Sequence, residues 1–361
     1  MKKKNNYVAI MAGGIGSRFW PVSRVDLPKQ FLDILNTGKT LIQSTFDRFA
    51  QFIEKENIYI VTSFQYKEIV AAQLPDLPLE NIVCEPSRKN TAPCVAYISY
   101  KLQQLDPKSN LICAPADHLI LDDIAFTKTC IEALDFTEKN NALLTLGIKP
   151  FQPNTGYGYI QYEQEAVNDN IYKVKTFTEK PDLELAKTFL SSGDFLWNAG
   201  IFVWKTKNII NAFEKYLPEM HELFDAARKS MNKETEKEAI DLIYPMCVSI
   251  SIDYGILEKA ENVYVIPSSF GWSDLGTWGS AYENLEKDYH ENAVAGHNVI
   301  LFDSFKNMVH SSNDKLILLQ GLEEFIVVDT ADALLICKKD NEQAIKEYLA
   351  EIKRNIGDKF L

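Results

Sequence analysis

The sequence predicts an α/β fold with a mixed, mainly parallel sheet, followed by a small C-terminal β-rich domain. In the first half, short apolar runs alternate with segments whose apolar residues recur at helical spacing. The apolar runs lack polar alternation, which is typical of parallel strands covered on both faces. From about residue 292, short strand-like runs follow one another with turn residues between them. We therefore expect a large domain at residues 1–290 and a β-rich domain at 291–361 that ends in a helix.

The expected elements follow in chain order. The first half gives strands at 7–12, 57–62, 81–84, 110–114 and 142–147, and helices at 40–53, 65–74, 91–104 and 124–136. The middle gives strands at 157–162, 171–177 and 200–204 and helices at 183–190 and 233–243. The charged segment 228–238 is expected to be a solvated turn and helix end. The last part gives strands at 298–303, 315–320, 324–329 and 333–337, and a terminal helix at 341–352.

Composition excludes several classes of protein. The 361 residues are 46% hydrophobic and carry a net charge of −12, which argues against a nucleic-acid partner because such binding needs a basic face. No apolar run approaches the ~20 residues of a membrane span, and the start has no signal-like segment. The six cysteines form no CxxC pair and do not cluster with histidines at zinc spacing. We expect a cytoplasmic protein with free thiols and no membrane partner.

A glycine-rich loop after the first strand is the most informative segment. Gly13, Gly14 and Gly16 follow the apolar run, and the cations Arg18, Arg24 and Lys29 come soon after. Strand, glycine loop and cations together bring backbone N–H groups and positive charge to a polyphosphate. Two common patterns fail, because a P-loop would need glycine where Arg18 stands and a dinucleotide fingerprint would need it at Phe19. The loop is therefore a phosphate-facing loop of another kind, with a tight βα turn and incidental surface cations as its alternative, and a dehydrogenase is disfavoured.

Three polar segments should meet at one edge of the sheet. The glycine loop follows the first strand, CEPSRKNTAP (84–93) overlaps the end of the third, and PADH (115–118) follows the fourth. Parallel strands bind ligands at their carboxyl ends. A carboxylate there, Asp117, suits Mg²⁺, which takes oxygen ligands, although a cap of a turn or helix is the simpler alternative. Asp274 is a second candidate, with a helix N-cap as its alternative.

The glycine segment resembles the signature of the sugar-1-phosphate nucleotidyltransferases. Its form, GGIGSRFWPVSR (13–24) followed by PKQF (28–31), resembles the mannose-1-phosphate guanylyltransferase branch. The same order of motifs continues through PADH, TGYGYI (155–160), FTEKP (177–181), WNAGIF (197–202) and GWSDLGTW (271–278). The resemblance implies a Rossmann-like nucleotidyltransferase domain. It also implies a single-activity enzyme, without the isomerase domain of longer members.

The resemblance assigns roles to residues of this sequence. It implies that the two aspartates, Asp117 and Asp274, hold Mg²⁺, and that the catalytic cations are Arg18, Lys29 and Lys180. The nucleotide would be bound by Ala12, Gly13, Gly14, Gly16, Ser17, Arg18, Lys29, Glu85, Asn90, Thr91 and Asp117. The sugar phosphate would be bound by Gly158, Glu179, Lys180 and Asn198. The alternatives for the last group are a surface charge pair and an asparagine in a β-turn.

The reaction that the resemblance implies is GTP plus α-D-mannose 1-phosphate giving GDP-mannose and pyrophosphate. A homodimer with the β-rich tail as its interface is compatible with it. Two alternatives stay open from the residues themselves. One is the same chemistry on another sugar phosphate or base, and the other is a non-catalytic nucleotide-sugar sensor. The presence of the loop cations and both carboxylates favours an enzyme.

Overall fold

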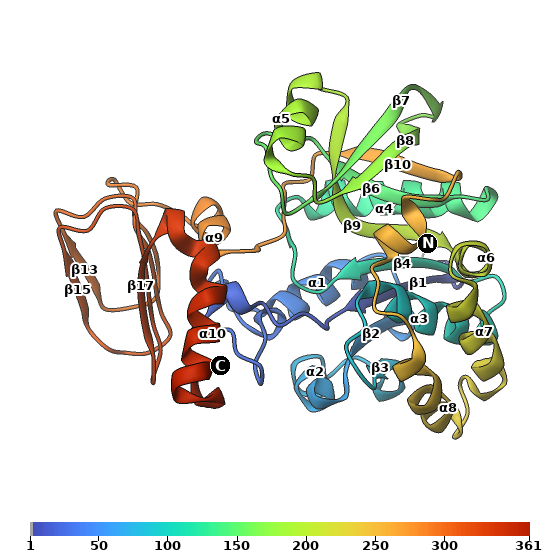
Figure 1. Cartoon of the computed structure of the whole chain (residues 1–361), viewed down its shortest axis with the longest axis horizontal. Helices are drawn as coiled ribbons and strands as arrows, with labels where there is room; N and C mark the ends of the chain where they lie inside the picture. Colours follow the sequence, from blue (N-terminus) through green and yellow to red (C-terminus); the bar gives the residue numbers. More distant parts are fainter. Residues whose placement is uncertain (1–2) are drawn as a thin grey trace. The chain divides into compact units, whose positions relative to one another are not determined.

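The computed structural model describes residues 3–361 and is built around a nine-stranded sheet (Figure 1). Four parallel strands form one half in the order β3-β2-β1-β4. They are β1 (Asn6–Met11), β2 (Ile58–Ser63), β3 (Ile82–Glu85) and β4 (Asn110–Pro115). Their carboxyl ends lie on one edge of the sheet, as the sequence predicts. The edge strand of this half is β3.

The other half of the sheet departs from the simple parallel order. Next to β4 lies β9 (Phe195–Lys205), which is antiparallel to both of its neighbours, β4 and β6 (Leu143–Ile148). The sheet ends with β10 (Val263–Ser268), β8 (Ile171–Glu179) and β7 (Gly158–Asn168). The expected strands at 157–162 and 200–204 are thus too short. The first is part of the longer strand β7, which forms a hairpin with β8. The second is part of the longer strand β9, which pairs with β4 and β6, strands that are remote in sequence.

Helices cover both faces of this sheet. Tyr7 and Ala9 of β1 belong to a core cluster with α3 (Thr91–Leu105), α6 (Thr206–Tyr216) and α7 (Pro218–Ala227). The alternate residues Val8 and Ile10 are also fully buried, so they face the opposite side. There α4 (Asp123–Lys139) packs on β4, β6, β9 and β10. The remaining helices here are α1 (Leu41–Ala50), α2 (Lys67–Gln73), α5 (Leu183–Ser192) and α8 (Glu236–Ile243).

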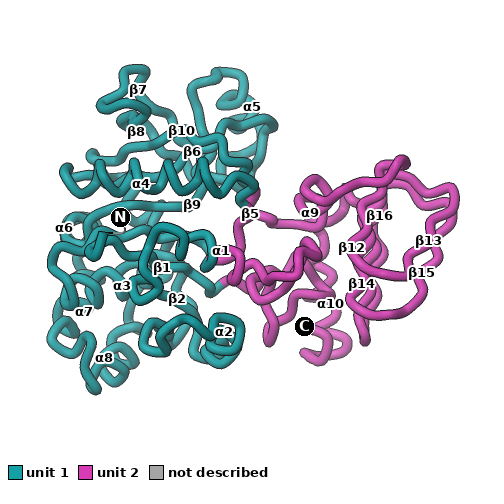
Figure 2. Tube along the Cα trace, turned by 180° about the vertical axis from the view of Figure 1, so that it is seen from behind, with its two compact units in different colours: residues 1–13, 46–115, 120–272 teal, residues 14–45, 116–119, 273–361 magenta. Residues whose placement is uncertain are grey.

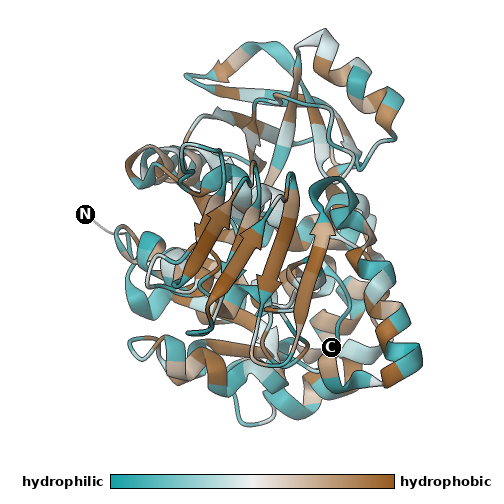
Figure 3. Ribbon diagram, turned by 90° about the vertical axis from the view of Figure 1, so that its left-hand side faces the viewer, coloured by the Kyte–Doolittle hydropathy of each residue, from teal (hydrophilic) through white to brown (hydrophobic). Residues whose placement is uncertain are grey.

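The C-terminal part consists of short, mostly parallel strands. One sheet has the order β12-β14-β16-β17, from β12 (Ala293–Ala295), β14 (Met308–Ser311), β16 (Phe325–Asp329) and β17 (Leu334–Lys338). A second contains β13 (Val299–Phe302) and β15 (Ile317–Gln320), and Figure 3 shows how apolar the strands of this region are. Helices α9 (Trp278–Asn284) and α10 (Ile345–Ile356) precede and follow them. Strands β5 (Leu119–Ile120) and β11 (Trp272–Ser273) pair separately.

The sequence-based prediction missed several helices and strands and misplaced some of the boundaries. Helices α6 and α7 and strands β10, β12 and β14 were not expected from the sequence. The terminal helix begins at Ile345 rather than 341, because residues 339–344 form a 3-10 helix. The charged segment 228–238 is largely a turn, and α8 starts only at Glu236.

The chain divides into two compact units (Figure 2). Unit 1 contains residues 1–13, 46–115 and 120–272, and unit 2 contains residues 14–45, 116–119 and 273–361. The glycine loop beyond Gly13 and the PADH segment beyond Pro115 therefore belong to the same unit as the C-terminal strands. A division into domains at residue 290 stays a prediction.

Candidate functional site

The loop that follows β1 is held in a fixed shape by its own unit. Gly16 has a φ of 64°, and a Cβ there would collide with the Cβ of Lys29. The Gln30 side chain donates to the Gly14 carbonyl at 3.0 Å, and the Ser23 hydroxyl donates to the Ile15 carbonyl at 2.8 Å. Nothing stands within 4 Å of a Cβ built on Gly14. The loop is thus rigid where it turns and open at Gly14, as close approach of a ligand requires.

Lys29 gathers the two aspartates that the sequence proposes as metal ligands. Its buried ammonium lies 2.8 Å from the Asp117 carboxylate, 2.9 Å from the Asp274 carbonyl and 2.8 Å from the Leu275 carbonyl. An ammonium has three donors, so these contacts use all of them. Burial alone would raise the pKa of Asp117. The positive charges of Lys29 and His118 outweigh this effect, so the pKa of Asp117 is lower than usual. Asp117 is therefore an anion at neutral pH.

Helix capping does not account for either aspartate. The N-cap of α4 is Asp122, and the N-cap of α9 is Thr277, which forms a capping box with Ser280. Asp274 instead accepts from the Gly276 N–H at 3.0 Å through Oδ1. The alternative that Asp274 is the N-cap of the helix is therefore wrong.

Arg18 lies in the 3-10 turn at Ser17–Phe19, and its Nε is buried without a hydrogen-bond partner among the described residues. Glu342, which was not expected from the sequence, lies near both Arg18 and Asp274. The positive charge of Arg18 lowers the pKa of Glu342, and the negative charge of Asp274 raises it. Burial is the larger effect and leaves the pKa of Glu342 above its usual value. Its carboxylate accepts from the Gly279 N–H at 2.7 Å. No motif indicated Glu342, because it lies in a 3-10 helix near the end of the chain, far from the other motifs.

In unit 1, the start of the glycine loop is next to Glu85. A Cβ on Gly13 would lie 3.6 Å from Oε2 of Glu85, and the other oxygen, Oε1, accepts a short hydrogen bond from the Tyr244 hydroxyl. Burial raises the pKa of Glu85 to about 7, although the Tyr244 bond lowers it. Ala12 has both of its backbone groups bonded to β2, through the Val61 carbonyl and the Thr62 hydroxyl.

Asn90 and Thr91 hold the start of α3. The Asn90 carbonyl oxygen Oδ1 accepts from the Thr91 N–H at 2.8 Å, and the Thr91 hydroxyl accepts from the Ile252 N–H at 2.9 Å. Asn90 also has a positive φ of 68°, which asparagine tolerates better than most residues. These contacts give both residues a structural role.

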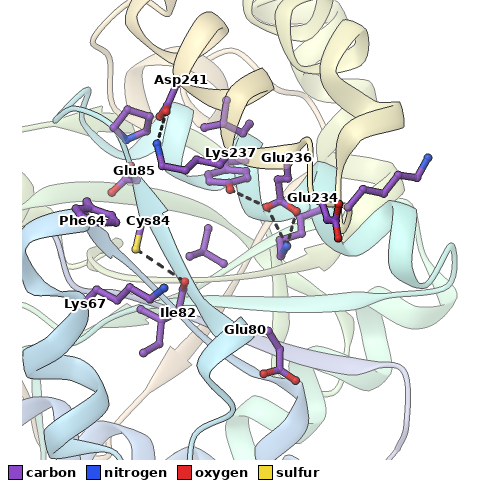
Figure 4. Close-up of a pocket in the computed structure, with 16 residues that line it drawn as sticks. Phe64, Lys67, Glu80, Ile82, Cys84, Glu85, Glu234, Glu236, Lys237 and Asp241 are labelled. Atoms are coloured by element: carbon purple, nitrogen blue, oxygen red, sulfur yellow. Dashed lines mark hydrogen bonds and ion pairs between the residues drawn. The ribbon is translucent and has the colours of Figure 1, made fainter.

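A cavity of about 510 Å³ lies beside the edge strand β3 and reaches Glu85 (Figure 4). Most of the charges on its α3 and α8 walls are paired. Lys101 and the Tyr97 hydroxyl both contact Glu236, and Lys237 pairs with Asp241. Apart from Glu85, none of the residues proposed from the sequence lines this cavity.

The predicted sugar-phosphate residues come together at β7, β8 and β9. Gly158 pairs with Glu179 across the β7–β8 hairpin, and a Cβ at Gly158 would collide with the Glu179 carboxylate. Lys180 has a φ of 48° and its ammonium lies 2.7 Å from Glu179. Burial lowers the pKa of Lys180, but Glu179 more than compensates, so the net shift is upward. The absence of a side chain at Gly158 thus makes room for the Glu179 carboxylate of this ion pair.

Asn198 has a fixed amide orientation. Its Oδ1 accepts from the Thr145 hydroxyl at 2.8 Å and from the Gly200 N–H at 3.1 Å, and its Nδ2 donates to Asp253 at 3.0 Å. Asp253 was not expected from the sequence. Its pKa rises to about 7 because the carboxyl group is buried and because Glu179 is near. Asp253 begins a π-helical turn (Asp253–Leu257). Such turns are frequent at functional sites but leave no mark in the sequence pattern.

Comparison with known proteins supports the assignment of this site to one family. The model for the family described as nucleotidyl transferase matches residues 7–291, which include all the candidate site residues described in this subsection except Glu342. The chain belongs to the nucleotidyl transferase family. A second model, for the MannoseP isomerase/GMP-like β-helix domain, matches residues 297–352. The fold class expected from the sequence is therefore confirmed, including its C-terminal β-rich part.

Several relatives are similar over nearly the whole chain. The mannose-1-phosphate guanylyltransferase RfbM of Salmonella typhimurium strain LT2 is 36% identical, over 97% of this chain and 73% of the relative. The alginate biosynthesis protein AlgA of Pseudomonas putida strain KT2440 is 36% identical, over 94% and 70% respectively. A crystal structure described as mannose-1-phosphate geranyltransferase from Thermus thermophilus superposes with a TM-score of 0.87 at 28% identity, covering 97% of this chain and 99% of that one. The family resemblance read from the motifs is confirmed.

Two features are absent from residues 3–361. No helix there has the length and apolar character needed to cross a membrane. No three His, Cys, Asp or Glu side chains in that range gather as a ready metal-binding cluster.

Proposed function

We propose that the protein transfers GMP from GTP to α-D-mannose 1-phosphate, giving GDP-mannose and pyrophosphate. The observation that carries the proposal is the cluster around Lys29. There a buried ammonium holds one carboxylate and the backbone of a second aspartate beside a rigid, open glycine loop. The names of the relatives support GTP and mannose 1-phosphate as the substrates.

The reaction needs positioning and charge neutralisation more than covalent chemistry. A phosphate oxygen of the sugar phosphate attacks the α-phosphorus of GTP, the bond to the β-phosphate oxygen breaks, and pyrophosphate leaves in line. The open backbone at Gly14 accommodates the triphosphate. Arg18, whose buried Nε has no hydrogen-bond partner within residues 3–361, contributes positive charge to the triphosphate. Lys29 contributes charge too, but mainly holds Asp117 and the Asp274 backbone in place.

Asp117 and Asp274 fit a divalent cation such as Mg²⁺. Both offer carboxylate oxygens, the donors that Mg²⁺ prefers, and the lowered pKa of Asp117 keeps that carboxyl ionised. When bound there, Mg²⁺ would neutralise charge on the reacting phosphates.

The sugar phosphate is assigned to the cluster on β7, β8 and β9. Glu179 accepts from sugar hydroxyls, Lys180 orients the attacking phosphate, and the fixed amide of Asn198 contacts the sugar, with Gly158 giving access. Asp253 keeps Asn198 oriented. For the base, Glu85 accepts from guanine, while Asn90 and Thr91 shape the adjoining helix start.

We also propose that the protein acts in the cytoplasm and forms a homodimer through its β-rich C-terminal part. The exposed apolar side chains of Ile300 and Leu318, paired neighbours on β13 and β15, support such an interface. Residues 1–290 are proposed as the catalytic domain and 291–361 as the C-terminal domain.

The test is pyrophosphate release by purified protein with Mg²⁺. GTP, ATP, UTP and dTTP are each paired with mannose 1-phosphate and with glucose 1-phosphate. Activity confined to GTP with mannose 1-phosphate is the expected result. Activity with another pair would overturn the specificity while keeping the reaction. If the protein binds GDP-mannose but turns over none of these substrate pairs, the proposed enzymatic function is wrong and the protein is a nucleotide-sugar sensor.

A further inference from the structure

The carboxyl group of Glu85 has two oxygens with different surroundings. Oε1 accepts the Tyr244 hydroxyl, and Oε2 lies 3.6 Å from the position of a Cβ on Gly13. Gly13 is the first glycine of the loop, and Glu85 ends the edge strand β3. One oxygen is therefore held by the protein, and the other is directed toward the loop that receives the nucleotide.

Tyr244 is a rigid support for this arrangement. Its side chain has no exposed surface, and its ring packs edge-on against Tyr97 at 6.5 Å and Phe224 at 6.3 Å between centroids. Burial and the neighbouring carboxylate raise its pKa far above the usual value, so the hydroxyl stays protonated and can only donate to Glu85. The Glu85 carboxylate is thus held in its orientation by a fully buried, closely packed side chain.

We propose that Tyr244 sets the base selectivity of the nucleotide site by holding the Glu85 carboxylate where it accepts from guanine, an inference that rests on the proposed function. Guanine carries N1–H and N2–H₂ donors on one edge, whereas the N1 of adenine is an acceptor. A carboxylate at that edge accepts hydrogen bonds from guanine. With adenine, the carboxylate oxygen would instead face the N1 acceptor, so no hydrogen bond could form there. Tyr244 is a positioning residue, because it acts through Glu85.

The charge of Glu85 gives a second readout. Its neighbours that titrate are the Tyr244 hydroxyl and the thiols of Cys84 and Cys94, whose pKa values are both raised, so the thiols stay neutral. The other charged residues that line the cavity are Lys67, Glu80, Lys233, Glu234 and the ion pairs Lys101–Glu236 and Lys237–Asp241. Because the Tyr244 bond lowers the pKa of Glu85, its loss leaves more of the carboxyl protonated at pH 7. A protonated carboxyl is a weaker acceptor for guanine.

The test compares kcat and KM for GTP, ITP and ATP in wild type and Tyr244→Phe at pH 7.0 and 8.5. ITP lacks the N2 amine. For Tyr244→Phe we expect kcat/KM for GTP to fall by about tenfold at pH 7.0, through KM, with kcat nearly kept. Activity with ATP should not fall, and the defect with GTP should shrink at pH 8.5. The matched control is Tyr97→Phe, which also loses a buried hydroxyl bonded to a glutamate, here Glu236 at 2.7 Å, and should keep the selectivity.

A double-mutant cycle with Glu85→Gln separates this role from a structural one. If Tyr244 acts through Glu85, the Tyr244→Phe change should have no further effect on GTP selectivity in the Glu85→Gln background. Wild type that does not prefer GTP overturns the proposed function and the inference with it. Wild type that prefers GTP, together with Tyr244→Phe of unchanged selectivity and pH profile, overturns the inference alone. Equal loss in both tyrosine variants would also refute it.

Discussion

Removing the ammonium of Lys29 should destabilise the protein in a pH-dependent way. Lys29→Met keeps most of the buried stem and deletes only the charge. The change removes the ion pair between Lys29 and Asp117 and the two hydrogen bonds from the ammonium to the carbonyls of Asp274 and Leu275. Breaking a buried pair costs about 3–5 kcal/mol, and we expect about 3 kcal/mol because Asp117 itself is partly exposed.

The pH dependence follows from the lowered pKa of Asp117. A carboxyl whose pKa is lower in the folded state contributes stability above its unfolded value of about 4, and this contribution is lost as pH falls through the folded pKa. Without Lys29 the carboxyl takes up a proton more readily. The destabilisation by Lys29→Met should therefore be large at pH 7 and smaller at pH 4.

Urea denaturation at both pH values, in the presence of EDTA, measures this effect. Trp20 and Trp278 belong to the core cluster of the same unit, so tryptophan fluorescence reports on it. The control is Lys187→Met, which removes an exposed pair with Glu184 and should change the free energy of unfolding by less than about 1 kcal/mol. A deficit for Lys29→Met below about 1 kcal/mol, or one that does not change with pH, would refute the reasoning.

Three further predictions concern individual carboxylates. Asp274→Asn should lower kcat by about a hundredfold, or ~2.7 kcal/mol, in the pyrophosphate assay and raise the Mg²⁺ concentration for half-maximal rate; a normal Mg²⁺ titration would remove Asp274 from the metal site. Asp253→Asn should raise the thermal midpoint at pH 8 but not at pH 4. With a folded-state pKa of about 7, the buried Asp253 carboxyl destabilises the folded protein as pH rises from about 4 to 7, and asparagine does not; equal effects at both pH values would contradict this. Glu342→Gln should raise KM for GTP severalfold with circular dichroism unchanged, since its charge faces Arg18, and a KM equal to wild type would show that Glu342 only caps Gly279.

Local patterns in the sequence were enough to predict the parallel half of the sheet and the order of the functional motifs. Apolar runs without alternation marked β1 to β4 because such strands are buried on both faces. The glycine loop was also readable, since Gly16 occupies a left-handed conformation that other residues adopt at a cost. These features depend on residues that are neighbours in the chain, so the sequence records them.

Which side chains meet became visible only in the folded chain. The antiparallel insertion of β9 beside β4, the support of Glu85 by Tyr244, and the approach of Glu342 to Arg18 join residues that are far apart along the chain. Lys29 was expected as a phosphate-facing cation, and its internal bonds to Asp117 and Asp274 emerged from the fold. Long-range contacts of this kind depend on how whole layers pack, and side-chain spacing in sequence carries no record of that packing.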